Sequence, residues 1–180
     1  MKVLLLGGTG AMGAYLAEIL AERGNDVFVT TRSDRKASQG ITYIKGNAHS
    51  EEFLKSVISD HYDAIADFMV YNTEEFKRRV DDLLAATEQY VFFSTSRVYS
   101  NADGDITEKT PRWLDVTDDQ EFLSSDEYAI TKARQEDILR KSGKKNWTII
   151  RPYITYSNER LQLGVLEKEY CFIEHCVGTV

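Results

Sequence analysis

The chain is poor in cysteine and proline, with two of each among its 180 residues. Two cysteines cannot build the disulfide framework of a small secreted domain, so we expect a reducing, cytoplasmic setting. Long apolar runs are also missing, because no stretch approaches the roughly 20 residues needed to span a bilayer. Gly7, Gly8 and Gly10 interrupt the apolar amino end, which we interpret as a first strand and not as a signal peptide.

A surplus of positive charge is absent as well. The chain has 22 lysines and arginines against 29 acidic residues, giving a formal net charge of −7 at pH 7. Nucleic-acid surfaces and docking on anionic membranes normally require excess basic residues, so we expect neither partner. A hydrophobic content of 42% and a length of 180 residues suffice for one well-buried domain.

What the sequence does contain is a regular alternation of apolar strand-like runs with helix-like segments. The runs are continuously apolar, as expected for strands whose two faces are both covered by helices. Such alternation predicts an α/β fold of the Rossmann type, with a doubly wound parallel sheet and right-handed crossovers. The expected strands are 2–7, 26–31, 41–46, 63–70, 90–96 and 147–153, and the expected helices are 13–24, 50–60, 72–89 and 124–143.

The glycine run between the first strand and the first helix predicts a phosphate-binding loop. The glycines at positions 7, 8, 10 and 13 satisfy G-x-x-G-x-x-G and, from the second glycine, G-x-G-x-x-G. Glycine lets the backbone turn tightly and approach a pyrophosphate, and the helix N-terminus supplies N–H groups. A merely tight strand-to-helix turn is the alternative. The expected dinucleotide contacts are Gly7, Gly8, Thr9, Gly10, Ala11, Met12 and Gly13.

The end of the second expected strand indicates which dinucleotide is bound. NAD sites usually place an acidic residue there, which binds the ribose hydroxyls and would repel a 2′-phosphate. Here the chain has Thr31 and Arg32, followed by Arg35 and Lys36. A guanidinium group binds phosphate through two hydrogen bonds, so the pattern favours NADP over NAD. A solvated basic turn is the alternative.

The opening residues of the last expected helix pair a tyrosine with a lysine. Ser124 and Glu127 have the spacing of a capping box, so we expect Ser124 to be the N-cap. Tyr128 and Lys132 then lie on one helical face, because residues four apart stack above one another. This spacing alone does not distinguish a catalytic pair from two helix residues that share a face.

Four motifs follow one another in the chain: the glycine loop at 7–13, FFSTSRVYS at 92–100, the Tyr128-x-x-x-Lys132 pair and IIRPYITYS at 149–157. In order and spacing they resemble the extended short-chain dehydrogenase/reductase family, specifically its NAD-dependent epimerase/dehydratase group. The resemblance implies an NAD(P)-binding Rossmann domain over 1–157. Since such proteins usually continue well beyond this point, residues 158–180 would begin a substrate lobe that is largely absent, or form a disordered tail.

The resemblance also implies a catalytic set of Thr95, Tyr128 and Lys132. Tyr128 would exchange a proton with a substrate hydroxyl or carbonyl as hydride moves, and Thr95 would hold that oxygen. If the register slips by one residue, Ser96 replaces Thr95. An unperturbed tyrosine titrates near about 10. We expect Lys132 and oxidised nicotinamide to lower the pKa of Tyr128, and Lys132 also to bond the nicotinamide ribose.

The resemblance implies further cofactor contacts at three positions. Asn47 stands where the family often has an acidic residue that meets the adenine amino group, and its amide oxygen can still accept a hydrogen bond. Pro152 and Ile154 would help to wall the nicotinamide pocket. The backbone of 66–72 should pass beneath the cofactor, although this segment lacks the small residues common in relatives.

The remaining candidate ligands predict no metal site. Two cysteines near the C-terminus flank Glu174 and His175, but a metal site usually needs four ligands in a folded frame. We therefore expect Cys171, Cys176 and their neighbours to be an incidental cluster. His49 and His61 have no nucleophile or metal-spaced partner in the sequence, so we expect both on the surface.

Together these features favour an NAD(P)-dependent oxidoreductase or epimerase. Its expected partner is a small-molecule substrate, such as a sugar nucleotide or a related hydroxyl or carbonyl compound. A non-catalytic NAD(P)-binding regulator or sensor is the alternative, and an RNA-binding relative is disfavoured by the acidic balance. An apolar face left by the missing lobe would favour a homodimer.

Overall fold

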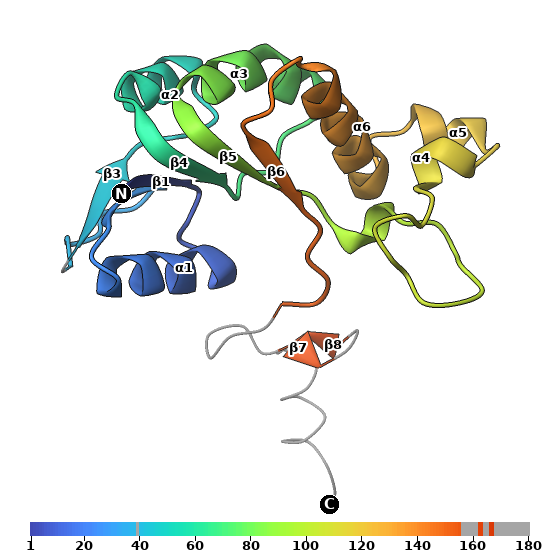
Figure 1. Ribbon diagram of the computed structural model, residues 1–180, viewed down its shortest axis with the longest axis horizontal. Helices are drawn as coiled ribbons and strands as arrows, with labels where there is room; N and C mark the ends of the chain where they lie inside the picture. Colours follow the sequence, from blue (N-terminus) through green and yellow to red (C-terminus); the bar gives the residue numbers. More distant parts are fainter. Residues whose placement is uncertain (39, 156–161, 164–165, 168–180) are drawn as a thin grey trace, which may run out of the picture.

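A six-stranded, fully parallel sheet organises the chain (Figure 1). The structure is a computed structural model that describes residues 1–38, 40–155, 162–163 and 166–167. The strands lie in the order β3-β2-β1-β4-β5-β6, which confirms the doubly wound Rossmann fold. Their bounds are β1 Lys2–Leu6, β2 Asp26–Thr31, β3 Ile41–Lys45, β4 Tyr62–Asp67, β5 Thr87–Phe93 and β6 Trp147–Ile150.

Helices lie on both faces of this sheet, as the continuous apolar strands require. In Figure 1, α1 lies below the sheet, whereas α2, α3 and α6 lie above it. The α4, α5 and η1 segments lie beside α6, and β7 and β8 form a separate antiparallel pair. The bounds are α1 Ala11–Glu22, α2 Glu51–Ile58, α3 Thr73–Ala85, η1 Ser96–Val98, α4 Trp113–Val116, α5 Gln120–Ser124, α6 Tyr128–Lys141, β7 Gln162–Leu163 and β8 Leu166–Glu167.

The core consists of two apolar clusters, one on each face of the sheet. Alternate residues of β1 supply both, because successive strand side chains point to opposite faces. Leu4 and Leu6 pack toward α2, α3 and α6, whereas Val3 and Leu5 pack toward α1. Each side chain that leaves water contributes on the order of 2 kcal/mol, so β1 anchors the fold from its centre.

The last long helix begins later than the sequence predicts. Ser124 is not its N-cap, because Ser124 ends α5, whose own cap is Asp119. Glu127 is the cap of α6 instead, and its carboxylate accepts hydrogen bonds from the N–H groups of Ala129 and Ile130. A carboxylate satisfies these N–H groups and also meets the positive end of the helix dipole. Tyr128 is consequently the first residue of the helix.

Three expected strands end three residues early, and the residues beyond their ends turn toward the site. β4 ends at Asp67, β5 at Phe93 and β6 at Ile150, whereas the sequence predicts strands to residues 70, 96 and 153. Residues 68–70, 94–96 and 152–155 instead line the pocket described below. Apolar character alone does not mark a strand end, because Val70, Tyr153 and Ile154 are apolar and yet exposed beyond the strands.

Several expectations concern the C-terminal part of the chain. The boundary predicted at 157 and most of the segment 158–180 lie outside the described residues, as does the cluster around Glu174 and His175. Within the described ranges, no group of three or more potential ligands could hold a metal ion, and no helix is long and apolar enough to cross a membrane. His49 and His61 are exposed, as predicted.

Candidate active site

A pocket opens at the carboxyl ends of the strands, beside the point between β1 and β4 where the strand order reverses. Open α/β sheets bind their ligands at this place. The β1–α1 loop, the residues after β4, the β5–η1 junction with α6, and the segment after β6 meet there. The lining residues are Gly7, Gly10, Ala11, Met12, Gly13, Phe68, Met69, Val70, Phe93, Ser94, Thr95, Ser96, Arg97, Tyr128, Lys132, Pro152, Tyr153, Ile154 and Thr155.

The β1–α1 loop has the geometry of a phosphate cradle. Gly7 has a φ of +65°, a conformation that favours glycine, and its N–H donates to Thr30 Oγ1 at 2.8 Å. A Cβ on Gly13 would lie 2.5 Å from the Cα of Gly8, so α1 starts directly against the loop. Gly10 caps α1 without a side-chain hydrogen bond from the described residues, which leaves first-turn N–H groups for an anion.

Replacing Gly13 by alanine is expected to destabilise the fold by about 1–3 kcal/mol and to weaken dinucleotide binding. The added Cβ would collide with the backbone of Gly8, which cannot rotate out of the way as a side chain would. Denaturant unfolding measures the change. Gly104→Ala is the matched control, because an added Cβ there meets no atom of the described residues within 4 Å. Equal stability of the two variants would exclude the close packing.

The three expected catalytic residues lie in this one pocket. Lys132 Nζ is 5.9 Å from the ring centroid of Tyr128, so the two side chains share a helical face as predicted. Tyr128 is 36% exposed, whereas Lys132 is only 2% exposed. Thr95 Oγ1 accepts a hydrogen bond from the N–H of Arg97 at 3.2 Å, and its own proton remains for a substrate oxygen. Ser96 also lines the pocket, so both register alternatives remain.

The protein groups by themselves shift the pKa of Tyr128 and the pKa of Lys132 in opposite directions. Burial raises the pKa of Tyr128 above its ordinary value, and Arg97 only partly opposes this effect. Burial also lowers the pKa of Lys132 to about 8, with Asp67 and then Glu136 acting in the other direction. The net shift of the Tyr128 pKa is therefore upward, because desolvation of the phenol outweighs the charge of Arg97.

Arg97 is a pocket residue that the sequence-based expectations missed. Its guanidinium carbon lies 5.9 Å from the Tyr128 ring centroid, the same distance as Lys132 Nζ. Its Nη2 also forms a 2.8 Å ion pair with Glu127, the cap of α6. Arg97 stands inside the FFSTSRVYS motif, so its position next to Ser96 was the available signal.

The other expected contacts lie outside the pocket lining. Gly8 is packed against Leu5. Thr9 lies in the loop between the lining residues Gly7 and Gly10 but is not itself a lining residue. Thr31 is buried, and its Oγ1 forms hydrogen bonds with the backbone of Ser33. Gly8 and Thr31 therefore make packing and hydrogen-bond contacts within the fold and do not line the pocket.

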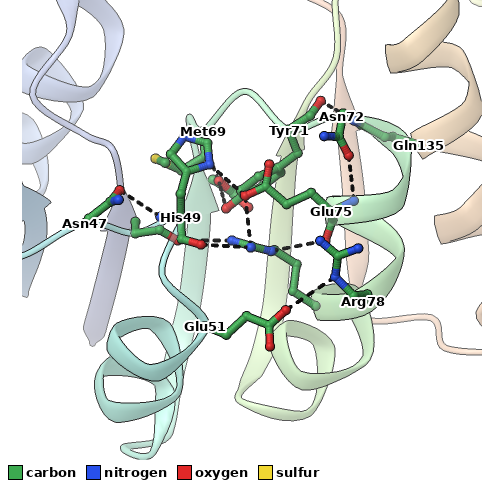
Figure 2. Close-up of polar contacts among 12 residues, drawn as sticks. Asn47, His49, Glu51, Met69, Tyr71, Asn72, Glu75, Arg78 and Gln135 are labelled. Atoms are coloured by element: carbon green, nitrogen blue, oxygen red, sulfur yellow. Dashed lines mark hydrogen bonds and ion pairs between the residues drawn. The ribbon is translucent and has the colours of Figure 1, made fainter. Parts of the chain in front are cut away.

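Two expected cofactor contacts are exposed. Arg32 lies just after β2, and Asn47 lies just after β3. Figure 2 shows Asn47 beside His49, and the Asn47 side-chain oxygen accepts from the His49 N–H at 3.1 Å. A carbonyl oxygen has a second lone pair, so Asn47 can still meet an adenine amino group.

Bulky residues after β4 form another part of the pocket that sequence reasoning did not assign. Phe68, Met69 and Val70 line it, although the resemblance implied only backbone here. The Met69 sulfur lies 2.7 Å from where a Cβ on Gly7 would be, so Met69 packs on the cradle. Phe68 stacks on Phe93 with ring centroids 4.2 Å apart. Only the three-dimensional arrangement shows which of these apolar side chains reach the pocket.

Comparison with known proteins places this geometry in a family. The family model described as NAD(P)H-binding matches residues 7–175. A chloroplast stem-loop binding protein of 41 kDa from Arabidopsis thaliana is 27% identical, over 86% of this chain and 42% of its own length. Vestitone reductase from Medicago sativa is 24% identical, over 85% of this chain and 58% of its own length.

Solved structures share the fold. The Bordetella bronchiseptica enzyme WbmH, in complex with NAD+, superposes with a TM-score of 0.65 at 22% identity, over 83% of this chain and 54% of that one. MoeE5, in complex with UDP-glucuronic acid and NAD, gives a TM-score of 0.62 at 20% identity, over 83% of this chain and 52% of that one. The chain thus spans about half the length of the proteins it matches.

Proposed function

Because the chain belongs to the NAD(P)H-binding family and has the fold of the short-chain dehydrogenases/reductases and epimerases, we propose that it is an NAD(P)-dependent oxidoreductase or epimerase. One observation carries the proposal: Tyr128, Lys132 and Thr95 line the same pocket as the glycine cradle. A dinucleotide held by its pyrophosphate on the cradle would reach these residues within a single cavity.

The residues of the pocket fit such a group. Apart from Gly10 and its two chain neighbours, no atom of the described residues lies within 4 Å of where a Cβ on Gly10 would stand, so the cradle has room for a pyrophosphate. The first turn of α1 offers N–H groups to it. The bound nicotinamide supplies the hydride acceptor or donor. Pro152 and Ile154, from the segment after β6, would wall the nicotinamide, and Asn47 would meet the adenine.

The chain's own residues would handle the proton. Tyr128 Oη takes a proton from a substrate hydroxyl on oxidation and returns it to the carbonyl oxygen on reduction. Lys132 favours the phenolate by its charge, and Thr95 donates its hydroxyl proton to the same substrate oxygen. Tyr128 is the first residue of α6, so the positive end of the helix dipole acts in the same direction.

We propose a small hydroxyl or carbonyl compound, such as a nucleotide sugar, as the substrate. The structure of MoeE5 with UDP-glucuronic acid and NAD supports this class, because that protein shares the fold. Arg97 supports it too, since a guanidinium beside Tyr128 suits a substrate that carries negative charge. In an epimerase, oxidation to a ketone and reduction from the other face would regenerate the cofactor.

Stem-loop binding, which names one relative, is not part of the proposal. Phosphate backbones are bound by surplus lysine and arginine, whereas this chain has a net charge of −7. We propose a small-molecule partner and no nucleic acid.

The cofactor is expected to be NADP, and Arg32 is expected to select it. Arg32 is exposed beside the buried end of β2, and the nearby acidic residue Asp34 is paired with Lys45 Nζ at 2.6 Å. NADP should therefore stabilise the chain more than NAD does at equal concentration. Thermal unfolding with both cofactors in parallel measures this, since ligand at 100 times its Kd adds about 2.7 kcal/mol.

The variant Arg32→Ala tests whether Arg32 contributes to NADP binding but not to NAD binding. We expect it to weaken NADP binding by about 10- to 100-fold, the value of a charge-assisted hydrogen bond, and to leave NAD binding unchanged. Arg23→Ala, at the far end of α1, is the matched control. A failure of both dinucleotides to stabilise the wild-type chain would reject the proposed function. An equal loss of NAD and NADP binding in Arg32→Ala would reject only the NADP preference.

A further inference from the structure

A buried carboxylate lies at the end of β4, next to the pocket. Asp67 is 1% exposed. Its Oδ2 accepts from the Tyr90 hydroxyl at 2.7 Å, and its Oδ1 accepts from the Met69 N–H at 2.9 Å and from the Tyr71 hydroxyl at 3.3 Å. These three donors are neutral. A buried carboxylate that stays ionised is normally paired with a positive charge, so the ionised form of Asp67 calls for a cation nearby.

Arg79, a buried arginine that lies 4.7 Å from the Tyr71 ring centroid, already has its own acidic partner. Figure 2 shows the polar contacts among Glu75, Tyr71 and their neighbours on this side of the sheet. Arg79 Nη2 lies 2.9 Å from Glu75 Oε1 and also donates to the His49 carbonyl, while Nε and Nη1 donate to the carbonyls of Glu75 and Ala48. The charge of Arg79 is thus balanced within α3.

A second cluster of charges, around the buried Glu136 of α6, is also balanced. Glu136 is fully buried and lies 2.6 Å from Arg151 Nη2, 3.2 Å from Arg112 Nη1 and 3.5 Å from Arg140 Nη1. Arg112 Nη2 also lies 2.7 Å from Asp115 and 2.9 Å from Asp137. The cluster thus joins three guanidinium groups, Arg112, Arg140 and Arg151, to three carboxylates, Glu136, Asp115 and Asp137.

Lys132 is the buried cation that these two clusters do not balance. Among the described residues, no carboxylate lies within 4.0 Å of its Nζ. The Nζ lies 4.5 Å from the ring centroid of Phe92, and Phe92 is the register partner of Asp67 in the β4–β5 pairing. Phe92 faces the side of the sheet that α6 covers. Gln135 Nε2 of α6 also donates to the Tyr71 carbonyl at 2.7 Å, which holds the helix against the loop after Asp67.

We propose that Asp67 is the counter-ion of Lys132, a positioning residue that holds the ammonium charged in the pocket across the Phe92 ring. This inference rests on the proposed function, because the charge matters for catalysis only if Lys132 acts on Tyr128. The titration supports the geometry. Burial lowers the pKa of Lys132 to about 8, and Asp67 is the first group that opposes this shift. Burial raises the pKa of Asp67, and Lys132 is among the groups that oppose that shift.

The other charged or titratable groups around Lys132 do not replace Asp67. On its own helix, Glu136 belongs to the balanced cluster, and Tyr128 is neutral with its pKa raised. Tyr90, on β5, is hydrogen-bonded to Asp67 itself. Arg97, on η1, lies by the Tyr128 ring and adds further positive charge. The groups from α3 and α4, Arg79 and Asp115, are paired as described above.

The variant Asp67→Asn tests the pair directly, because it removes the charge and keeps the shape. In the full chain without cofactor, the Lys132 Cε resonance gives the titration midpoint of the ammonium by carbon-13 NMR. We expect the midpoint to fall by about one pH unit or more from its wild-type value near 8. Tyr90→Phe is the matched control, since it removes the 2.7 Å hydrogen bond but leaves the Asp67 charge. Its midpoint should stay near the wild-type value.

Equal midpoints in wild type and Asp67→Asn would overturn the proposal, and so would an equal shift in Tyr90→Phe. If Asp67→Asn does not fold, Lys132→Met replaces it as the variant. The Asp67 Cγ resonance should then titrate at a higher pH than in the wild type, and an unchanged midpoint there would overturn the proposal.

Activity gives the second measurement. With a substrate that the chain turns over, the alkaline limb of the pH profile of kcat/KM should move to lower pH in Asp67→Asn. The reason is that Lys132 would lose its proton at a lower pH than in the wild type. The NMR titration needs no substrate, so the two proposals can fail separately. If the midpoint shifts but the chain turns over no substrate, the Asp67–Lys132 pair is supported and the proposed enzymatic function is rejected. Turnover with an unshifted midpoint rejects the pair alone.

Discussion

Replacing Tyr128 by phenylalanine is expected to reduce turnover by about 10²- to 10⁴-fold while cofactor affinity stays unchanged. The phenol hydroxyl is the proposed proton carrier, and phenylalanine keeps the ring that Lys132 and Arg97 both approach to 5.9 Å. The pocket shape and the glycine cradle are therefore preserved. Steady-state kinetics, together with cofactor titration of the same preparation, measure both quantities.

Tyr153→Phe is the matched control for this experiment. Tyr153 lines the same pocket but is exposed and lies after β6, away from the helix that carries Lys132. Loss of its hydroxyl should leave turnover near the wild-type rate. Full activity in Tyr128→Phe would contradict the proposed mechanism. Tight cofactor binding by a wild-type chain that turns over no substrate would favour a regulatory or sensing role instead.

Replacing Glu136 by glutamine is expected to destabilise the chain by about 3–5 kcal/mol, a larger loss than the one expected for Gly13→Ala. The carboxylate is fully buried and accepts two hydrogen bonds from Arg151, at 2.8 and 2.6 Å. Glutamine has a similar shape but no charge, so positive charge would remain buried without compensation. Denaturant unfolding at neutral pH measures the loss.

The destabilisation caused by Glu136→Gln should become smaller as the pH falls. Burial alone would raise the pKa of Glu136, but the hydrogen bonds and charge of Arg151 outweigh it, and the net shift is downward. The stabilisation is therefore complete above the unfolded-state pKa of about 4.3 and is lost as pH falls through the lower folded value. Wild type and Glu136→Gln should converge in acid.

Asp137→Asn is the control for Glu136→Gln, since Asp137 pairs with the same arginine cluster from a partly exposed position. Its loss should cost at most about 1 kcal/mol, because solvent compensates the remaining charge. A difference between Glu136→Gln and wild type that persists undiminished in acid would show that packing, and not charge, holds this region.

The sequence predicted the sheet because its signals are local and repeated. Each strand is a continuous apolar run, and the glycine spacing at 7–13 sits between a strand and a helix, so period and context agree. Tyr128 and Lys132 were placed on one face by helix geometry alone, which does not depend on where the helix begins. The error at Ser124 consequently left that relation intact.

What the sequence did not predict depends on contacts between distant segments. Asp67 and Lys132 are 65 positions apart, and only the pairing of β4 with β5 under α6 brings them together. The upward shift of the Tyr128 pKa is likewise a matter of burial, which no spacing rule reports. The pKa shifts of pocket residues therefore follow from the folded structure and not from sequence spacing.

The central place of β1 in the sheet has a consequence for how the molecule is made. β1 is synthesised before the other strands of its sheet, yet it pairs with β2 on one side and with β4 on the other, so its second neighbour emerges some sixty residues later. The pocket closes only when the segment after β6 arrives. Contacts between such distant parts of a chain slow folding. A ribosome-bound chain that stops before Trp147 should therefore hold the cradle without its far wall.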